Sequence, residues 1–271
     1  MPYNKFKSIW TGIIIILLIY TGIFVPYKLA FILEDVQSLV VLDMIVDILF
    51  FIDIIINFFS AIEAKGGKLI QDLKTIAKMY LTGWFWLDLI ACIPFDMIGD
   101  GTDEYMTDAS DNNELFRLLR LPRLYRLVRL LRLVKMLRVF KNSNLIMGLI
   151  DAVHVTPAVT RLMKTLFGVV YLVHLFACIW FFTAGFTRKY DSWVDMLGLW
   201  DEPANFKYLV SVYWAFQTVT TVGFGDIGIT HLEEYLLVVF WMLFGVSVYT
   251  FTIGIVSSII ASIDQKAYIL S

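Results

Sequence analysis

The chain has 271 residues, of which 59% are hydrophobic, 16% aromatic and 17% charged, and its formal net charge is -2. Its mean hydropathy is +0.75. These values exclude an ordinary soluble domain and indicate a polytopic membrane protein, with no reason to expect a nucleic-acid partner. Both cysteines, Cys92 and Cys178, lie in apolar stretches, which favours buried thiols over a disulfide or a metal site.

Hydropathy predicts six membrane-spanning helices, because six stretches are long and apolar enough to cross a bilayer. They cover approximately residues 9–31, 39–62, 80–98, 115–140, 159–182 and 232–263. The connection between the second and third stretches is rich in lysine, whereas residues 99–114 hold six acidic residues and no basic one. Since basic loops favour the cytoplasmic side, both termini are predicted in the cytoplasm, in a protein of the plasma membrane.

The fourth stretch carries a cation at every third position, separated mostly by leucine and valine. These cations are Arg117, Arg120, Arg123, Arg126, Arg129, Arg132, Lys135 and Arg138. Acidic side chains in the preceding stretches are predicted to pair with them. These acids are Asp43, Asp47, Asp53, Asp88 and Asp96. Because charges held inside a membrane respond to its potential, the ladder predicts a voltage sensor; a static ion-pair bundle is the alternative. A basic surface helix, a calmodulin target or a nucleic-acid arm would not explain the acids.

Residues 220–226, with the sequence TTVGFGD, predict a cation site. Gly223 and Gly225 alternate with residues that carry side chains, so the backbone can turn successive carbonyl oxygens the same way. Oxygen ligands suit a hard, weakly hydrated cation. Residues 208–218 predict a short helix whose C-terminal dipole faces the site. A glycine-rich turn between two buried helices is the alternative.

The TTVGFGD segment resembles the selectivity filter of tetrameric potassium channels, with Phe224 where tyrosine is commoner. Other motifs are similar to the ether-à-go-go and cyclic-nucleotide-regulated branch of voltage-gated channels. They are LDMIVDILFFID at 42–53, GWFWLD at 83–88, IPFD at 93–96 and HLFACIW at 174–180. The resemblance implies an all-α membrane protein with six transmembrane helices, a re-entrant pore helix and a homotetrameric assembly. It divides the chain into a voltage-sensor domain (1–141), an elbow (142–158) and a pore domain (159–271).

The same resemblance implies roles for individual residues. Potassium would be bound by the filter residues Thr221, Val222, Gly223, Phe224 and Gly225. Phe50 would be the aromatic plug past which the gating charges move, with Asp53 and Asp88 as inner countercharges. Asp43 and Asp47 would form an outer pair that either attracts a divalent cation or makes sensor salt bridges. The gate and hinge would involve Gly245, Tyr249, Ile253 and Gly254, with ordinary small-residue packing as the alternative for the glycines.

The sequence therefore predicts potassium conduction under the control of membrane voltage. Neither an enzymatic activity nor a cofactor is expected, and potassium is the permeant ion. A nonselective voltage-gated cation channel and an electrically silent regulatory subunit are the alternatives. The family usually carries a cyclic-nucleotide-binding domain after its last span, whereas only eight residues follow Ile263, so no cyclic-nucleotide partner is expected for this chain.

Overall fold

A computed structural model describes residues 5–32, 37–60, 62–63, 69–70, 72–92, 157–186 and 192–270. The predicted fourth span with all its gating charges, Asp96 and nearly all of the predicted elbow lie outside the described residues. The chain divides into two compact units, one formed by Met1–Val25 with Glu34–Leu145 and the other by Pro26–Leu33 with Ile146–Ser271. Helix α1 (Lys5–Phe31) contributes residues to both units.

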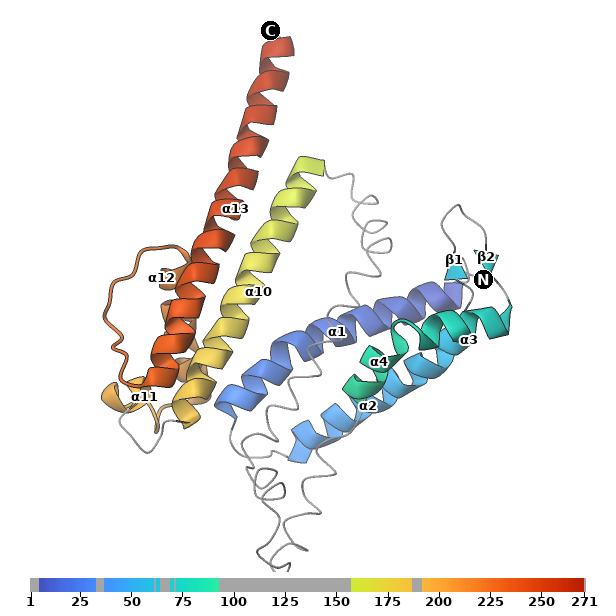
Figure 1. The fold of residues 1–271 in the computed structure, drawn as a ribbon, viewed down its shortest axis with the longest axis horizontal. Coiled ribbons are helices and arrows are strands. Elements are labelled where there is room, and N and C mark those ends of the chain that lie inside the picture. The colour runs from blue at the N-terminus through green and yellow to red at the C-terminus, as the bar shows by residue number, and fades with distance from the viewer. Residues whose placement is uncertain are drawn as a thin grey trace, which may run out of the picture. The chain divides into compact units, whose positions relative to one another are not determined.

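The first unit is built on a helical hairpin. Besides the first part of α1, this unit contains α2 (Gln37–Phe58), β1 (Ile62–Glu63), β2 (Leu69–Ile70), α3 (Leu73–Leu81) and α4 (Phe85–Cys92). Helix α2 forms one arm of the hairpin, and α3 with α4 forms the other. Strands β1 and β2 form an antiparallel pair, and both α3 and α4 pack on α2 (Figure 1). Ile14 and Leu18 of α1 are buried against Val46 and Phe50 of α2, so this part of α1 completes an apolar core with the hairpin.

The third predicted span differs from the structure where it begins. Tyr80 belongs to α3, and a turn at residues 82–84 separates α3 from α4. The N–H of Thr82 donates to the carbonyl of Lys78 at 3.0 Å, and that of Gly83 donates to the carbonyl of Tyr80 at 3.1 Å. These bonds satisfy the last carbonyls of α3 and end it. The apolar sequence runs through the turn, so hydropathy alone did not separate the two helices.

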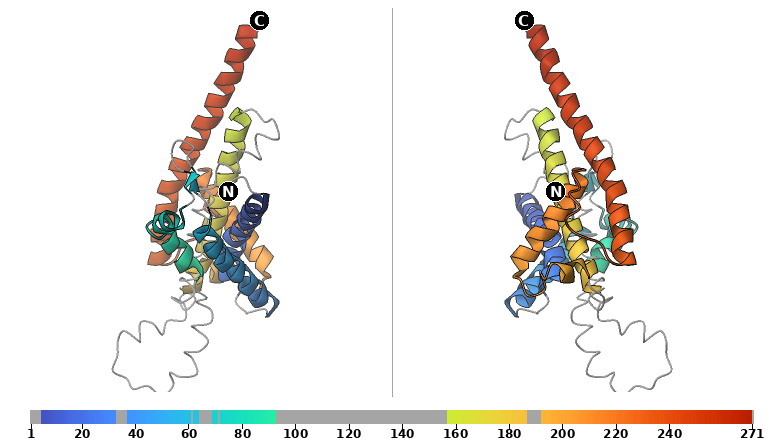
Figure 2. Two further views of the ribbon diagram at one scale, coloured as in Figure 1. Left: turned by 90° about the vertical axis from the view of Figure 1, so that its right-hand side faces the viewer. Right: turned by 90° about the vertical axis from the view of Figure 1, so that its left-hand side faces the viewer.

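The second unit packs three helices against one another, and the predicted filter segment follows the middle one in the sequence. Its elements are α10 (Pro157–Phe186), α11 (Trp193–Met196), α12 (Ala204–Val219) and α13 (Leu232–Leu270). Helices α10 and α13 run side by side in opposite directions, and α12 packs on both (Figures 1 and 2). Helix α10 begins with Pro157, which is tolerated at the first helical position because it needs no N–H partner there.

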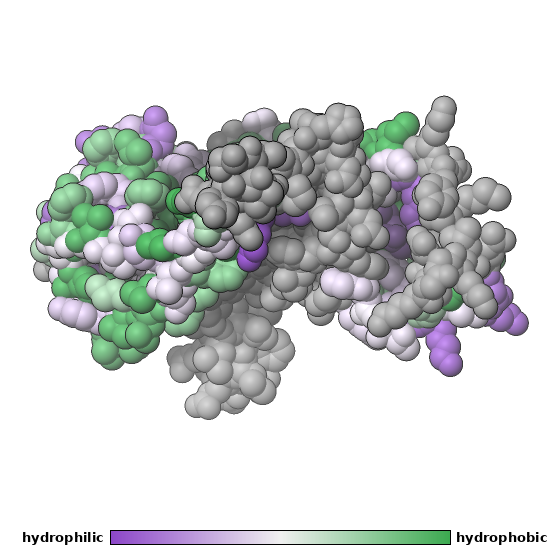
Figure 3. Space-filling model, turned by 90° about the horizontal axis from the view of Figure 1, so that it is seen from above, coloured by the Kyte–Doolittle hydropathy of each residue, from purple (hydrophilic) through white to green (hydrophobic). Residues whose placement is uncertain are grey.

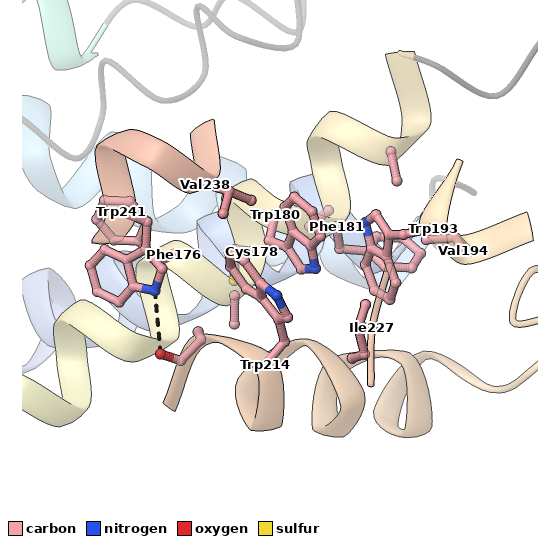
Figure 4. Packing of buried hydrophobic residues seen from close by; sticks show 14 of the residues in the cluster. Phe176, Cys178, Trp180, Phe181, Trp193, Val194, Trp214, Ile227, Val238 and Trp241 are labelled. Carbon is pink, nitrogen blue, oxygen red and sulfur yellow. Dashed lines mark hydrogen bonds between the residues drawn. The ribbon is translucent and has the colours of Figure 1, made fainter. Parts of the chain in front are cut away.

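Stacked aromatic rings hold α12 against its neighbours (Figure 4). Trp180 of α10 stacks on Trp214 of α12 with ring centroids 4.1 Å apart. Phe176 stacks on Trp241 of α13 at 3.6 Å. The indole N–H of Trp241 also donates to the backbone carbonyl of Ala215 in α12 at 3.3 Å. Because each aromatic pair adds about 0.5–1.5 kcal/mol beyond its buried area, these contacts fix α12, and the segment that follows it, between α10 and α13.

Three of the described helical segments are long and apolar enough to cross a membrane: Phe6–Phe31, Ala158–Gly185 and Leu232–Ala261. Helix α2 has 22 residues but carries three aspartates, which set it apart from these by composition. Many large hydrophobic side chains lie on the described surface (Figure 3). Exposed apolar area of this extent is expected where a protein faces lipid or another subunit.

Candidate cation site and charged helices

The backbone of the predicted filter segment has a positive φ, the left-handed conformation, at every second residue from 221 to 225. Helix α12 ends at Val219, and φ is then positive at Thr221 (60°), Gly223 (57°) and Gly225 (72°). A Cβ added to either glycine would meet nothing within 4 Å in this chain, so glycine is needed there for its backbone conformation rather than for space. Thr221 adopts the same region at an energetic cost, because non-glycine residues rarely do so.

Four successive N–H groups of this segment bond to the end of α12. The N–H of Thr221 donates to the carbonyl of Thr218 at 3.1 Å. The N–H groups of the next two residues, 222 and 223, both donate to the carbonyl of Gln217, at 3.0 and 3.2 Å. The N–H of Phe224 donates to Oε1 of the Gln217 side chain at 3.0 Å. In a strand that alternates hands, the N–H groups share one edge and the carbonyl groups share the other. We therefore expect the carbonyl edge to be directed away from α12, where oxygen atoms in a row could bind a cation.

The last residue of the segment, Asp226, is hydrogen-bonded to two side chains of α12. Asp226 accepts from the hydroxyl of Tyr213 at 2.7 Å and from Nε2 of Gln217 at 3.1 Å. The Tyr213 bond first, and then the Gln217 bond, lower the pKa of Asp226, which lies outside the membrane-spanning helices. Gln217 thus braces both the backbone of Phe224 and the side chain of Asp226. Sequence reasoning missed Gln217, although an amide side chain among the apolar residues just before the predicted filter was the available signal.

Another carboxylate of this unit, unlike the exposed Asp226, is buried and joins the ends of two helices. Glu234, in the first turn of α13, is completely buried. Its Oε2 accepts from the backbone N–H (3.1 Å) and the hydroxyl (3.3 Å) of Thr230, and its Oε1 accepts from the backbone N–H of Trp193 at 3.5 Å. Trp193 is the first residue of α11, and N–H groups at helix N-termini lack intrahelical partners. Glu234 therefore caps α11 and stabilises the approach to α13.

The predicted gate residues lie along α13, which continues as a helix through all four of them. A Cβ on Gly245 would lie 3.3 Å from Cα of Val219, the last residue of α12, so this glycine permits close packing beneath the filter segment. A Cβ on Gly254 would meet nothing within 4 Å. Tyr249 and Ile253 are exposed in the single chain. Close packing explains Gly245, and its role as a hinge stays a prediction.

In the first unit, the predicted inner countercharges Asp53 and Asp88 are buried and accept hydrogen bonds from neighbouring side chains. Asp53 accepts from the indole N–H of Trp10 at 2.9 Å and from Nδ2 of Asn57 at 3.0 Å. Phe50, the predicted plug residue, is only 2% exposed one turn before Asp53. Asp88 of α4 accepts from the hydroxyl of Tyr80 at 2.6 Å. The structure thus gives both acids fixed positions on the hairpin, and Trp10 is a contributor that sequence reasoning did not identify.

The predicted outer pair lies one helical turn apart on α2. Asp43 is buried and Asp47 is half-buried. Among the described residues, no group of three or more histidine, cysteine, aspartate or glutamate side chains could hold a metal ion. A divalent cation at this pair therefore stays a prediction, as does the alternative of a sensor salt bridge.

Comparison with known proteins agrees with these features. Residues 7–268 match the family described as ion transport protein. The chain is 33% identical to the mouse voltage-gated inwardly rectifying potassium channel KCNH7 and 31% identical to the human voltage-gated delayed rectifier potassium channel KCNH5, over 96% of its length in each case. It is 29% identical, over 95% of its length, to the potassium voltage-gated channel unc-103 of Caenorhabditis elegans. It spans 22%, 27% and 32% of these three relatives, respectively.

These similarities cover nearly the whole chain and confirm the resemblance to the ether-à-go-go type of channel that the motifs predicted. The family transports ions, so the chain is not an enzyme. The chain is a membrane protein and belongs to the ion transport protein family.

Proposed function

We propose that this chain is a subunit of a voltage-gated, potassium-selective channel. The observation that carries the proposal is the filter segment, where positive φ at every second residue from 221 to 225 accompanies four successive N–H groups bound to α12. This geometry supports a strand whose carbonyl oxygens are turned away from α12. One chain supplies one such strand, so a closed ring of ligands needs several, and we propose a homotetramer with fourfold symmetry.

Voltage dependence is proposed to come from the cations of residues 117–138, which move relative to Phe50, Asp53 and Asp88. A charge that crosses the full potential exchanges about 2.3 kcal/mol per 100 mV. About three charges in each of four sensors would supply roughly 28 kcal/mol per 100 mV, which is ample to move a gate. The burial of Asp53 and Asp88 supports this assignment, because buried acids stabilise cations that pass close to them.

The proposed arrangement places six spans in each subunit, with both termini in the cytoplasm of a plasma-membrane protein. Residues 1–141 form the sensor, 142–158 the elbow and 159–271 the pore. Potassium is the only ligand proposed, bound by the carbonyl edge of residues 221–225. The gate is assigned to the region of Tyr249 and Ile253 on α13.

Voltage-step recording from cells that express the chain tests this proposal. Tail currents should reverse at a potential that follows external potassium by about 59 mV per tenfold change. A reversal potential that does not change when potassium replaces sodium would instead support a nonselective channel. A chain that reaches the surface and carries no current at any voltage would support a silent regulatory subunit.

A further inference from the structure

Helix α3 is a short, lysine-bearing helix between the apolar helices α2 and α4. It has nine residues, so its length of about 14 Å is less than half the thickness of a bilayer core. It carries exposed lysines at 74 and 78, one helical turn apart and therefore on one face. It leads through a three-residue turn into α4, which has no lysine or arginine. In the proposed topology, the third span follows this helix, so α3 would lie next to the membrane surface.

The inner face of α3 is fixed to the rest of the first unit. Ile76 and Tyr80 are buried on this face. The ring of Tyr80 packs edge-on against Phe58 of α2 (centroids 5.0 Å apart) and Phe85 of α4 (5.8 Å), and its hydroxyl donates to Asp88. Because two neighbouring helices hold this face, the direction of the outer face relative to the hairpin is set.

The outer face combines cations with exposed apolar side chains. Leu73 (54% exposed) and Leu81 (41% exposed) lie at the two ends of α3, close to the exposed Lys74 and Lys78. Trp86, which follows the turn, is 60% exposed. Lysine beside leucine and tryptophan is the composition of helices that lie in the membrane interface, because the cations meet headgroups while the apolar groups enter the acyl boundary.

The surrounding segment carries a net positive charge. Residues 64–81 contain four lysines and one acidic residue, Asp72, for a sum of +3. That carboxylate caps α3 by accepting from the backbone N–H (3.1 Å) and hydroxyl (2.6 Å) of Thr75, and these bonds lower the pKa of Asp72. Asp72 is therefore engaged with the helix N-terminus, and the lysine face of α3 complements an anionic surface.

We propose that α3 is a lipid-binding element whose Lys74 and Lys78 bind the headgroups of anionic phospholipids in the adjacent leaflet. The proposal rests on the membrane topology given under Proposed function, which makes this the cytoplasmic leaflet, and does not require ion conduction. Each lysine near such a surface favours the bound state about fivefold, so the pair contributes about thirtyfold. Because Tyr80 joins α3 to Asp88 and to the end of α2, lipid binding here holds the base of the hairpin that carries the predicted countercharges.

The test uses the full chain in nanodiscs, with Met79, an exposed residue of α3, replaced by cysteine in a Cys92→Ser, Cys178→Ser background and labelled with an environment-sensitive fluorophore. In phosphatidylcholine with added phosphatidylserine, the emission should shift to shorter wavelength and aqueous quenchers should lose access, relative to phosphatidylcholine alone. Raising the salt concentration should weaken the effect. This readout is independent of current, so its failure is distinct from failure of the proposed channel function.

Two double variants make the test specific. Lys74→Gln with Lys78→Gln should lower the ratio of lipid-bound to unbound α3, measured from the emission in discs that contain phosphatidylserine, by about thirtyfold. Lys74→Arg with Lys78→Arg keeps both charges and the fold, and should behave as the parent does. Equal emission in the two lipid mixtures, or a glutamine variant that responds as the arginine variant does, would overturn the proposal.

Discussion

Replacement of Glu234 by alanine should destabilise the second unit more than any other single loss of an acidic side chain described in it. The carboxylate is completely buried and accepts two bonds from Thr230 and a longer one from Trp193. Hydrogen bonds to a charged group contribute about 1.5–3 kcal/mol each, and the N–H of the buried Trp193 would lose its acceptor, whereas Thr230 is exposed. Counting the two shorter bonds and neglecting the longer one, we expect Glu234→Ala to cost about 3–6 kcal/mol.

The adjacent residue provides a matched control. Glu233 has the same side chain and lies in the same first turn of α13, but it is exposed. Glu233→Ala should change stability by about 0.5 kcal/mol or less. The loss of stability in Glu234→Gln should fall between those of the two alanine variants. The glutamine amide keeps one acceptor oxygen, but its NH₂ group replaces the other and would face a hydrogen-bond donor of Thr230 or Trp193. Thermal unfolding of the purified protein in detergent measures all three variants. Equal unfolding midpoints for the Glu233 and Glu234 alanine variants would refute the reasoning.

Three further predictions follow from other contacts. Gly245→Ala should impair conduction, because the added methyl group overpacks against α12 at a cost of about 1–3 kcal/mol. Gly254→Ala should not, because a Cβ there meets open space. Macroscopic conductance per surface channel compares the two variants, and equal values would exclude close packing at Gly245 as the cause. Trp10→Phe removes the hydrogen bond to the buried Asp53 and should move the activation midpoint by about 20–40 mV. Trp86→Phe should leave the midpoint where it is. An unchanged midpoint in the Trp10 variant would contradict the role given to this bond. The lowered pKa of Asp226 means that its contribution to stability is complete above the ordinary value of about 3.9 and is lost as pH falls through the lower folded value. Tetramer retention should therefore persist at an external pH of about 5, and dissociation centred near neutral pH would disprove the assignment.

Much of the helical pattern could be predicted from the sequence because lipid-facing and buried helices both require long apolar runs. The short helix expected at residues 208–218 is present within α12, and the first, second, fifth and sixth predicted spans correspond to α1, α2, α10 and α13. The helix ends were less predictable. Helix α13 continues to Leu270, beyond the predicted end at 263, because hydropathy reports apolar content and not helical hydrogen bonding.

Short elements escaped prediction because they have too few residues to show a period. Helix α11 has only four, and its signal was the pair Ser192 and Asp195, which form a capping box. The β1–β2 pair was likewise missed, although Gly66 and Gly67 between the strands are typical of a turn. The bracing of the filter by Gln217 depends on where α12 ends relative to the segment that follows, which residue spacing alone does not supply.

Bi-ionic recording from the purified chain in a planar bilayer, with potassium on one side and sodium on the other, tests the central claim most directly. The account predicts single-channel currents that reverse far toward the potassium equilibrium potential. It also predicts that Gly223→Ala, which places a side chain where φ is +57°, abolishes them. Currents that reverse near zero, or selectivity that survives in the Gly223→Ala variant, would contradict the claim that residues 221–225 form a potassium filter.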